Sequence, residues 1–169
     1  FMSKPLELFM IAVALLSIVI GAFSGLAQKS IRRILAFSAV MNAGFIVLGL
    51  LLPNYATGVV QLGPMYFFLI TYAIASAGAL TGIAYFSGND DEWESLDAIR
   101  GLGRENPLVG LGVIICLASL AGLPSLAGFL AKFTVFAGLF GAKLYMVAII
   151  GFILSIVAAV YYLRIAYVL

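Results

Sequence analysis

Long apolar stretches with almost no charge are the feature that most restricts what this chain can fold into. A helix that crosses the hydrocarbon core of a bilayer needs about 20 mostly apolar residues. Four stretches reach this length, at residues 5–27, 34–52, 64–86 and 144–168. Apolar residues make up 64% of the 169-residue chain and charged residues 9%, whereas a soluble domain has roughly 45–50% and about 25%. The sequence therefore predicts an all-α integral membrane protein.

A fifth apolar region, residues 107–140, contains a helix break. Pro107 suits the first turn of a helix, where its missing N–H is not needed. The motif Gly122-Leu123-Pro124 then interrupts the helix, because an internal proline removes a backbone donor and clashes with the preceding turn. Each half is short for a membrane span. We therefore predict one discontinuous fourth helix, broken near 122–124, with six crossings as the alternative.

These elements predict a single transmembrane domain, residues 1–169, of five helices with a polar loop at 87–106. We expect the loop to be solvated, with a short amphipathic helix through Trp93, Leu96 and Ile99. Five crossings place most basic residues on one side, which the positive-inside rule assigns to the cytoplasm or the mitochondrial matrix. That side holds Lys29, Arg32, Arg33, Arg100, Arg104 and Arg164, and the other holds Lys4 and Lys143.

Residue types exclude several kinds of site. The chain has no histidine and one cysteine, Cys116, which excludes a zinc or haem site built on histidine, a Ser–His–Asp triad and a disulfide framework. The net charge is +2 and the basic residues are dispersed, so we expect no nucleic-acid partner. We also expect no metal or cofactor site in this chain. The apolar stretch at residues 5–27 is too long for a cleavable signal peptide. The chain opens on Phe1-Met2, so we expect a fragment or a shortened gene product.

Lys132 is the candidate for chemistry, because it is a charged residue inside the apolar run LAGFLAKFTVFAGLF. An ionisable group at membrane depth costs at least about 2.5–3.5 kcal/mol on insertion scales. An apolar environment favours the neutral amine of a lysine, so such a residue could load and release a proton. The alternative is a snorkelling lysine, whose stem lies along apolar surface while the amine reaches the interface.

The helix break strengthens the prediction for Lys132 because the two lie close in sequence. Broken membrane helices leave backbone groups unpaired, and transporters place such breaks beside ion pathways. Ser125, Gly128 and Lys132 have the spacing of one helical face, so we predict that they lie together after the break at Gly122 and Pro124. The alternative is a simple proline kink or a tight turn between two short helices.

Other intramembrane polar residues could line a hydrated path. Ser38 and Asn42 share one helical face, and Tyr72 and Ser76 share another, with Thr71 beside them. The alternative role for each is a hydrogen bond that holds two helices together.

Two stretches of the chain resemble a known family. Residues 28–50 read QKSIRRILAFSAVMNAGFIVLGL, in which Arg33 to Ser38 match the pattern R-x-L-A-[YF]-S. Residues 96–136 contain LAGLPSLAGFLAKF, which matches L-A-G-[IL]-P-x-x-x-G-F-x-x-K-F. Both stretches resemble the antiporter-like subunits of respiratory complex I. The resemblance is strongest to the group known as subunit 2, or subunit N in bacteria.

The resemblance implies a fold of two inverted five-helix repeats, of which this chain would be the second. It implies that Lys132 exchanges protons while quinone is reduced elsewhere, with flavin, iron–sulfur clusters and quinone held by other parts of the complex. It also implies other membrane subunits as partners, antiporter-like ones among them, together with lipids and a separate polypeptide that supplies the first repeat. Asn42 departs from the family, which often has histidine there, and asparagine cannot titrate.

Three functions are compatible with these features. The first is a subunit of a proton-pumping NADH:ubiquinone oxidoreductase. The second is a subunit of a cation/proton antiporter or a membrane-bound hydrogenase. The third is a structural remnant that no longer pumps. We expect the mitochondrial inner membrane as the location, because a shortened subunit suits a reduced organelle genome, with a bacterial plasma membrane as the alternative.

Overall fold

The chain forms a bundle of long helices in a computed structural model that describes residues 4–52, 62–87, 95–97 and 99–169. In chain order the helices are α1 (Lys4–Ala27), α2 (Ile31–Leu50), α3 (Leu62–Ser87), α4 (Pro107–Ala121), α5 (Ala127–Gly141) and α6 (Tyr145–Val168), with a short 3₁₀ helix, η2 (Leu102–Arg104), before α4. Among the described residues, α1, α2, α3 and α6 are long and apolar enough to cross a membrane, and α4 and α5 are shorter apolar helices.

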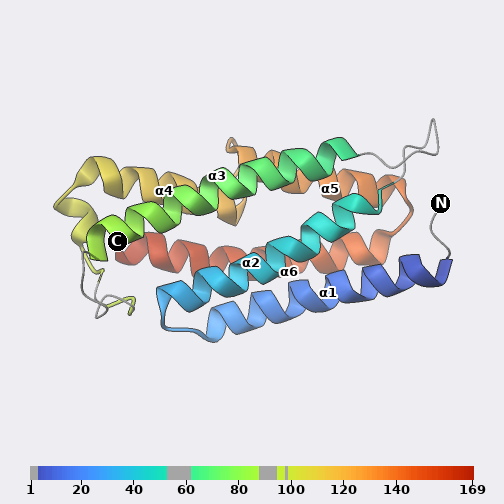
Figure 1. Ribbon diagram of the computed structural model, residues 1–169, viewed down its shortest axis with the longest axis horizontal. Helices are drawn as coiled ribbons and strands as arrows, with labels where there is room; N and C mark the ends of the chain where they lie inside the picture. The colour runs from blue at the N-terminus through green and yellow to red at the C-terminus, as the bar shows by residue number, and fades with distance from the viewer. Residues whose placement is uncertain (1–3, 53–61, 88–94, 98) are drawn as a thin grey trace.

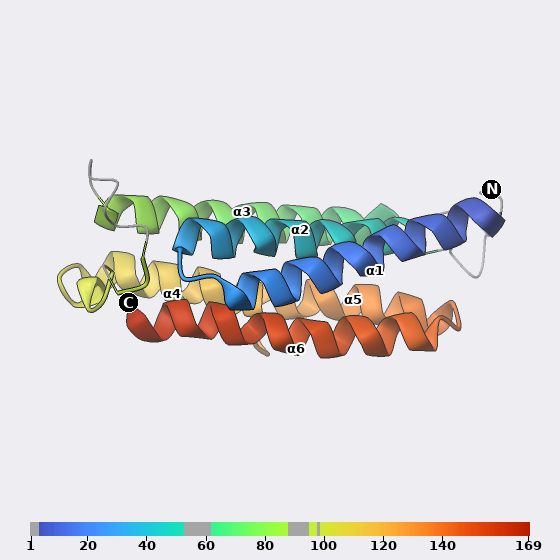
Figure 2. The ribbon, with the colours of Figure 1, turned by 90° about the horizontal axis from the view of Figure 1, so that it is seen from below.

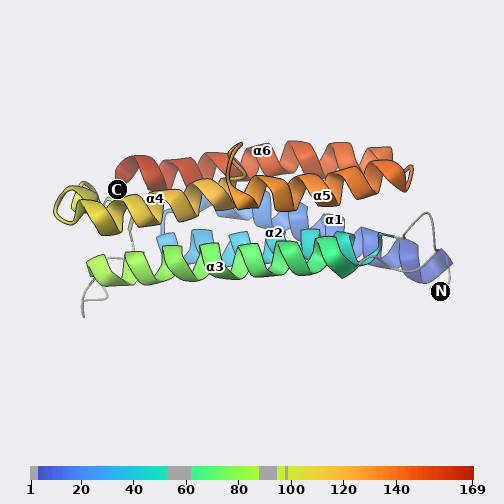
Figure 3. The ribbon, with the colours of Figure 1, turned by 90° about the horizontal axis from the view of Figure 1, so that it is seen from above.

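The two short helices complete one crossing between them. α4 and α5 have 15 residues each and follow one another along the length of the bundle, with their connection projecting sideways (Figures 1 and 3). α1 starts at one end of the bundle and α6 finishes at the other (Figure 1), as an odd number of crossings requires. The predicted fold class, an all-α membrane bundle with a discontinuous fourth helix, is confirmed, and the end-to-end arrangement of α4 and α5 favours five crossings over six.

Three helix starts differ by two or three residues from the expected positions, and one of them is α3, which begins at Leu62 instead of residue 64. α2 begins at Ile31 instead of residue 34, because the Ser30 side chain accepts a hydrogen bond from the Arg33 N–H at 3.5 Å and caps the helix. This N-cap places the basic residues Arg32 and Arg33 in the first turn. The half-helix after the break begins at Ala127, two residues beyond Ser125, where we expected it to restart.

The polar loop does not contain the expected amphipathic helix in its described part. Leu96 and Ile99 lie in turns and are buried, while Trp93 is outside the described residues. An antiparallel bridge between Ser30 and Ser95, with a 3.3 Å hydrogen bond from the Leu96 N–H to the Lys29 carbonyl, attaches the loop to the α1–α2 turn. Pairing with the α1–α2 turn thus takes the place of the helix that the local periodicity of the loop predicted.

Small residues let the helices approach closely around one core. α1 packs on α2 and α6, and α3 packs on α4 and α5 (Figure 2). A Cβ atom added to Gly21 would lie 2.6 Å from the Phe37 carbonyl oxygen on α2, and one added to Gly82 would lie 2.2 Å from Val113 on α4. Larger residues at these positions would force the helices apart. The close packing positions α2, α3 and α6 around the broken helix.

Candidate functional site

The first half of the broken helix ends in a motif that leaves two carbonyl groups without a backbone hydrogen-bond donor. Gly122 adopts φ +83°, a left-handed conformation that glycine tolerates without steric cost. Its N–H donates to the Ser119 carbonyl at 3.0 Å, and the Leu123 N–H donates to the Ala118 carbonyl at 3.0 Å. This pair of bonds is the Schellman motif. The carbonyls of Leu120 and Ala121, in the last turn of α4, then need another donor.

The amine of Lys132 supplies that donor. Lys132 Nζ donates to the Leu120 carbonyl at 2.8 Å and lies 3.5 Å from the Ala121 carbonyl. The side chain is only 6% exposed, so it points to the break and does not snorkel toward an end of its half-helix. A cation at a helix C-terminus is also stabilised by the helix dipole. The helix break therefore provides acceptors for the Lys132 amine, and the amine provides a donor for the carbonyls at the break.

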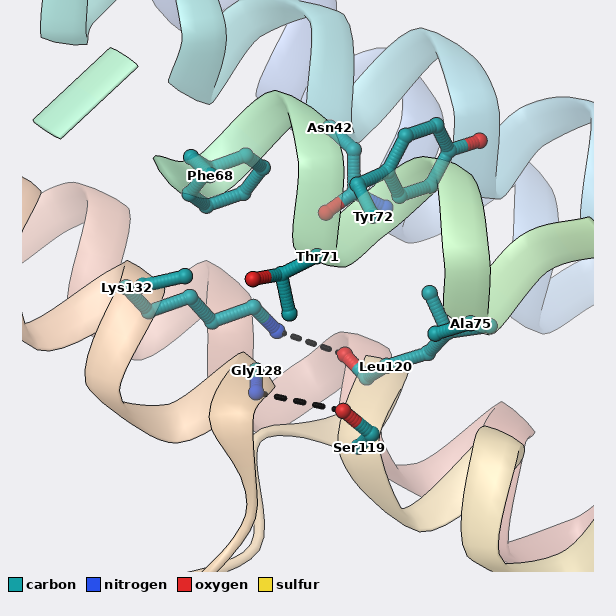
Figure 4. Close-up of a pocket in the computed structure, with 10 residues that line it drawn as sticks. Asn42, Phe68, Thr71, Tyr72, Ala75, Ser119, Leu120, Gly128 and Lys132 are labelled. Atoms are coloured by element: carbon teal, nitrogen blue, oxygen red, sulfur yellow. Dashed lines mark hydrogen bonds between the residues drawn. The ribbon is translucent and has the colours of Figure 1, made fainter. Parts of the chain in front are cut away.

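The start of the second half-helix, α5, is likewise capped by a side chain from the other half-helix, α4. The Gly128 N–H, in the first turn of α5, donates to Ser119 Oγ of α4 at 3.1 Å, as Figure 4 shows. A Cβ atom added to Gly128 would lie 1.8 Å from the Ser119 carbonyl oxygen. Ser119 of α4 thus caps α5, while Lys132 of α5 caps α4.

Ser125 does not lie on the helical face that we predicted it to share with Gly128 and Lys132. Ser125 is exposed and lies outside α5, with φ +78°. Its left-handed backbone turns the chain before the helix restarts, so the spacing of Ser125 from Lys132 is not a helical spacing. Pro124 is exposed in the same connection. The prediction that Ser125, Gly128 and Lys132 share one face is therefore wrong for Ser125, while Gly122 and Gly128 lie where the break requires them.

A small cavity lies beside the Lys132 amine. Its volume is about 10 Å³, close to the minimum that admits one water molecule. α3 lines one side of it with Phe68, Thr71, Tyr72 and Ala75, and α2 contributes Asn42. Thr71 lies beside the Lys132 amine, which is directed at the Leu120 carbonyl (Figure 4). A water held there would meet polar groups from three helices.

A neutral cluster of hydrogen-bonded side chains lies on the α2 side of the cavity. Asn42 Nδ2 donates to the Ser38 carbonyl at 2.8 Å and to the Tyr162 hydroxyl at 3.2 Å, and the Ser38 and Tyr162 hydroxyls also form a hydrogen bond. All three side chains are buried. With its nitrogen engaged, Asn42 presents its amide oxygen toward Thr71 and Lys132 (Figure 4).

The predicted polar residues of α2 and α3 line a second cavity together. This cavity of about 270 Å³ is bordered by Ser38 and Arg32 of α2 and by Tyr72 and Ser76 of α3. The Ser76 hydroxyl also donates to the Ala73 carbonyl of its own helix at 3.2 Å. The structure therefore brings Ser38, Asn42, Tyr72 and Ser76 around two neighbouring spaces.

Three residues of the site were not selected from the sequence as candidates. Ser119 has a recognisable signal, a serine three residues before the left-handed glycine that ends α4. Thr71 was noted only as a neighbour of Tyr72 and Ser76, although its spacing places it on the face of Phe68 and Ala75. Tyr162 has no local signal, because its hydrogen bonds cross from α6 to α2.

No group of three or more histidine, cysteine, aspartate or glutamate side chains that could hold a metal ion occurs in the described part of the chain. The polar groups beside Lys132 are the amide of Asn42, backbone carbonyls, and the side chains of Thr71, Tyr72 and Ser119.

Residues 1–158 match a family model described as NADH:quinone oxidoreductase/Mrp antiporter, TM. The chain belongs to this family. Among its relatives is NADH-quinone oxidoreductase subunit N of Parvibaculum lavamentivorans, which is 34% identical over 97% of this chain and 33% of its own length. The match to this family confirms the resemblance stated from the sequence motifs.

Solved structures of this antiporter family have the same fold. A chain in respiratory complex I from Thermus thermophilus, solved with bound aureothin, matches with a TM-score of 0.82 and 34% identity, over 94% of this chain and 35% of that one. A chain of the Mrp complex from Dietzia sp. matches with a TM-score of 0.83 and 26% identity, over 96% and 30%. The chain thus spans about a third of the length of the relatives it matches.

Proposed function

We propose that this chain is part of a membrane-arm subunit of a proton-translocating NADH:quinone oxidoreductase, and that Lys132 is its proton-exchange site. The observation that carries the proposal is the buried Lys132 amine, held by α4 carbonyls at a helix break and facing a cavity for one water. The 34% identity to a subunit N over nearly the whole chain supports the choice of complex.

The geometry around Lys132 suits reversible proton binding. The protonated amine has three donors, and the carbonyls of Leu120 and Ala121 accept from it. The third donor is free for a water in the cavity, through which a proton can leave. The neutral amine still donates to Leu120, so both charge states keep a partner. Electron transfer would take place in other subunits, which would hold the flavin, the iron–sulfur clusters and the quinone.

The proposed partners are the other membrane subunits of that complex and the lipids around them. Large apolar side chains cover the outer faces of the helices, among them Phe9 and Phe23 of α1 and Ile74 of α3, which suits contact with lipid or with neighbouring subunits. A separate polypeptide supplying a first repeat belongs to the same proposal. We place the protein in a bacterial plasma membrane, the second of the two expected locations, because the relatives named above are bacterial; the mitochondrial inner membrane is the other.

The decisive experiment replaces Lys132 in the complete complex reconstituted into vesicles. Lys132→Met removes the titrating group, and Lys132→Arg keeps a permanent charge and the donors. We expect both variants to lower the number of protons moved per NADH oxidised, because neither can bind and release a proton. Lys143→Met is the matched control, since Lys143 is exposed in the α5–α6 turn, and it should pump normally. Full pumping by Lys132→Met would instead favour the structural remnant.

A second function has its own supporting observation. The fold also matches a chain of the Mrp complex at a TM-score of 0.83, so a cation/proton antiporter subunit is the alternative. Purification in mild detergent separates the two. Flavin and iron–sulfur proteins that co-purify with this chain support the oxidoreductase, and antiporter-type subunits alone support the exchanger.

A further inference from the structure

Two cavities of very different size lie on either side of one tyrosine. The one-water cavity at Lys132 and the cavity of about 270 Å³ near Arg32 share only two lining residues, Tyr72 and Leu120. Leu120 is apolar and its carbonyl is already engaged by Lys132. Among the residues that border both spaces, Tyr72 therefore has the only side chain that can donate and accept a hydrogen bond.

The Tyr72 side chain is oriented as a connection between these spaces. Its ring lies beside Asn42, and its hydroxyl points away from the Lys132 amine (Figure 4). Ser38 and Ser76, which also carry hydroxyl groups, line the larger cavity together with Tyr72. The half-buried ring closes the small cavity, while the hydroxyl belongs to the large one.

The larger cavity leads to a defined end of the bundle. Arg32, in the first turn of α2, borders it, and the α1–α2 turn carries Lys29 beside it. The start of α4 and the end of α6 lie at this same end (Figure 1), and with them Arg104 and Arg164. The lining of the cavity is mixed: Arg32, Ser38, Tyr72 and Ser76 contribute polar groups, and the other lining residues are leucines and alanines.

We propose that Tyr72 is the junction through which Lys132 exchanges protons with the cavity near Arg32, and so with the membrane side that carries Lys29 and Arg33. The proposal rests on the proposed function of Lys132. As the Tyr72 hydroxyl accepts a proton from one neighbour, it donates its own to the next, and a rotation of the O–H bond restores the starting state. An N–H bond of protonated Lys132 breaks as the first O–H bond forms, each later O–H bond forms as another breaks, and no co-reactant is consumed.

Access from each side of the membrane tests the route without measuring pumping. In the complete complex with Cys116→Ala, Ser76→Cys places a thiol at the large cavity and Thr71→Cys places one at the small cavity. A small, membrane-impermeant cationic methanethiosulfonate is added to one side of sealed vesicles at a time. Ser76→Cys should be labelled from the Lys29 side and not from the Lys143 side. Thr71→Cys should stay unlabelled until Tyr72→Ala opens the passage.

Other labelling patterns overturn the route. Labelling of Ser76→Cys from the Lys143 side, equal labelling from both sides, or no labelling at all would remove the large cavity as the access path. Labelling of Thr71→Cys with Tyr72 intact would remove Tyr72 as the barrier. Because these results report access alone, they can fail while Lys132→Met still abolishes pumping, and the two proposals fail separately.

Proton transfer through the hydroxyl is tested by Tyr72→Phe, which keeps the ring. A positioned proton-transferring side chain accelerates its step by about 10²–10⁴, so we expect proton uptake by the variant to slow at least about tenfold. Tyr66→Phe on the same helix is the control, since Tyr66 is 52% exposed on the outer face. Normal proton uptake by Tyr72→Phe would overturn the role of the hydroxyl.

Discussion

Two buried polar sites lie on either side of one small cavity, and they are stabilised differently. In the Ser38–Asn42–Tyr162 cluster, neutral side chains from α2 and α6 bond mainly to one another, and both helices are continuous. At Lys132, a charged side chain bonds to backbone carbonyls of α4, which are available only because that helix ends there.

The difference shows why the helix break accompanies the lysine. A continuous helix uses nearly all its carbonyls in its own hydrogen bonds, so it can offer few acceptors to a buried amine. Ending α4 at Gly122 frees the Leu120 and Ala121 carbonyls and places the negative end of a helix dipole beside Lys132. A neutral network needs no such device. The comparison predicts that variants at the break will lower the free energy of unfolding more than variants in the neutral cluster.

The largest effect is expected at Gly128. Gly128→Ala adds a Cβ atom that would lie 1.8 Å from a backbone oxygen of Ser119, so the two half-helices must separate. Forced overpacking of a core costs about 1–3 kcal/mol, and we expect the upper end of this range in SDS unfolding of the complex in mixed micelles. Gly112→Ala on α4 is the control, because no atom of another described helix or loop lies within 4 Å of its added Cβ. Equal stability of the two variants would contradict the close approach.

Lys132→Met is the next variant in order of effect. It leaves the carbonyls of Leu120 and Ala121 without their side-chain donor, and an unsatisfied buried polar group costs about 1–3 kcal/mol. Lys132→Arg keeps donors and charge, so it should lose less stability in the same unfolding assay. The reverse order of the two variants would show that the amine does not cap α4.

Tyr162→Phe measures the neutral cluster on the same scale. It removes the hydroxyl that Ser38 and Asn42 contact, at a cost of about 1–1.5 kcal/mol for a net hydrogen bond. Tyr167→Phe is the control, since Tyr167 is 88% exposed, and its stability should be unchanged. A loss at Tyr162 larger than that of Lys132→Met would reverse the comparison between the two sites.

Ser119→Ala should have the smallest effect of the four. It removes the cap on the Gly128 N–H, and loss of an N-terminal cap costs about 1 kcal/mol. Thr134→Val is a suitable control because the Thr134 hydroxyl donates to the Ala131 carbonyl of its own helix at 2.8 Å and does not bridge the two half-helices. Hydrogen exchange at the first turn of α5 should increase in Ser119→Ala and stay unchanged in the control.

Much of the site was predictable from local features of the chain. The apolar lengths predicted the crossings, Gly122 and Pro124 predicted the break, and the isolated charge of Lys132 predicted a special environment. The failures were also local. Ser125 was placed on a helical face by spacing, but its left-handed backbone lies before the helix restarts. The helix expected through Leu96 and Ile99 is replaced by pairing with the α1–α2 turn.

The sequence by itself determined that the chain spans a membrane, where its helices run and that one of them is broken beside a lysine, because hydrophobic length and the Gly–x–Pro motif act within a few neighbouring residues. Only the tertiary structure decided that Lys132 caps α4, that Ser119 caps α5 and that Tyr162 bonds to Asn42. These contacts depend on how α2, α3 and α6 are shifted along and rotated about their axes. That arrangement follows from close packing at residues such as Gly21 and Gly82. The spacings Gly21-x-x-x-Gly25 and Gly78-x-x-x-Gly82 indicate a close helix approach, but they do not say which helix is the partner.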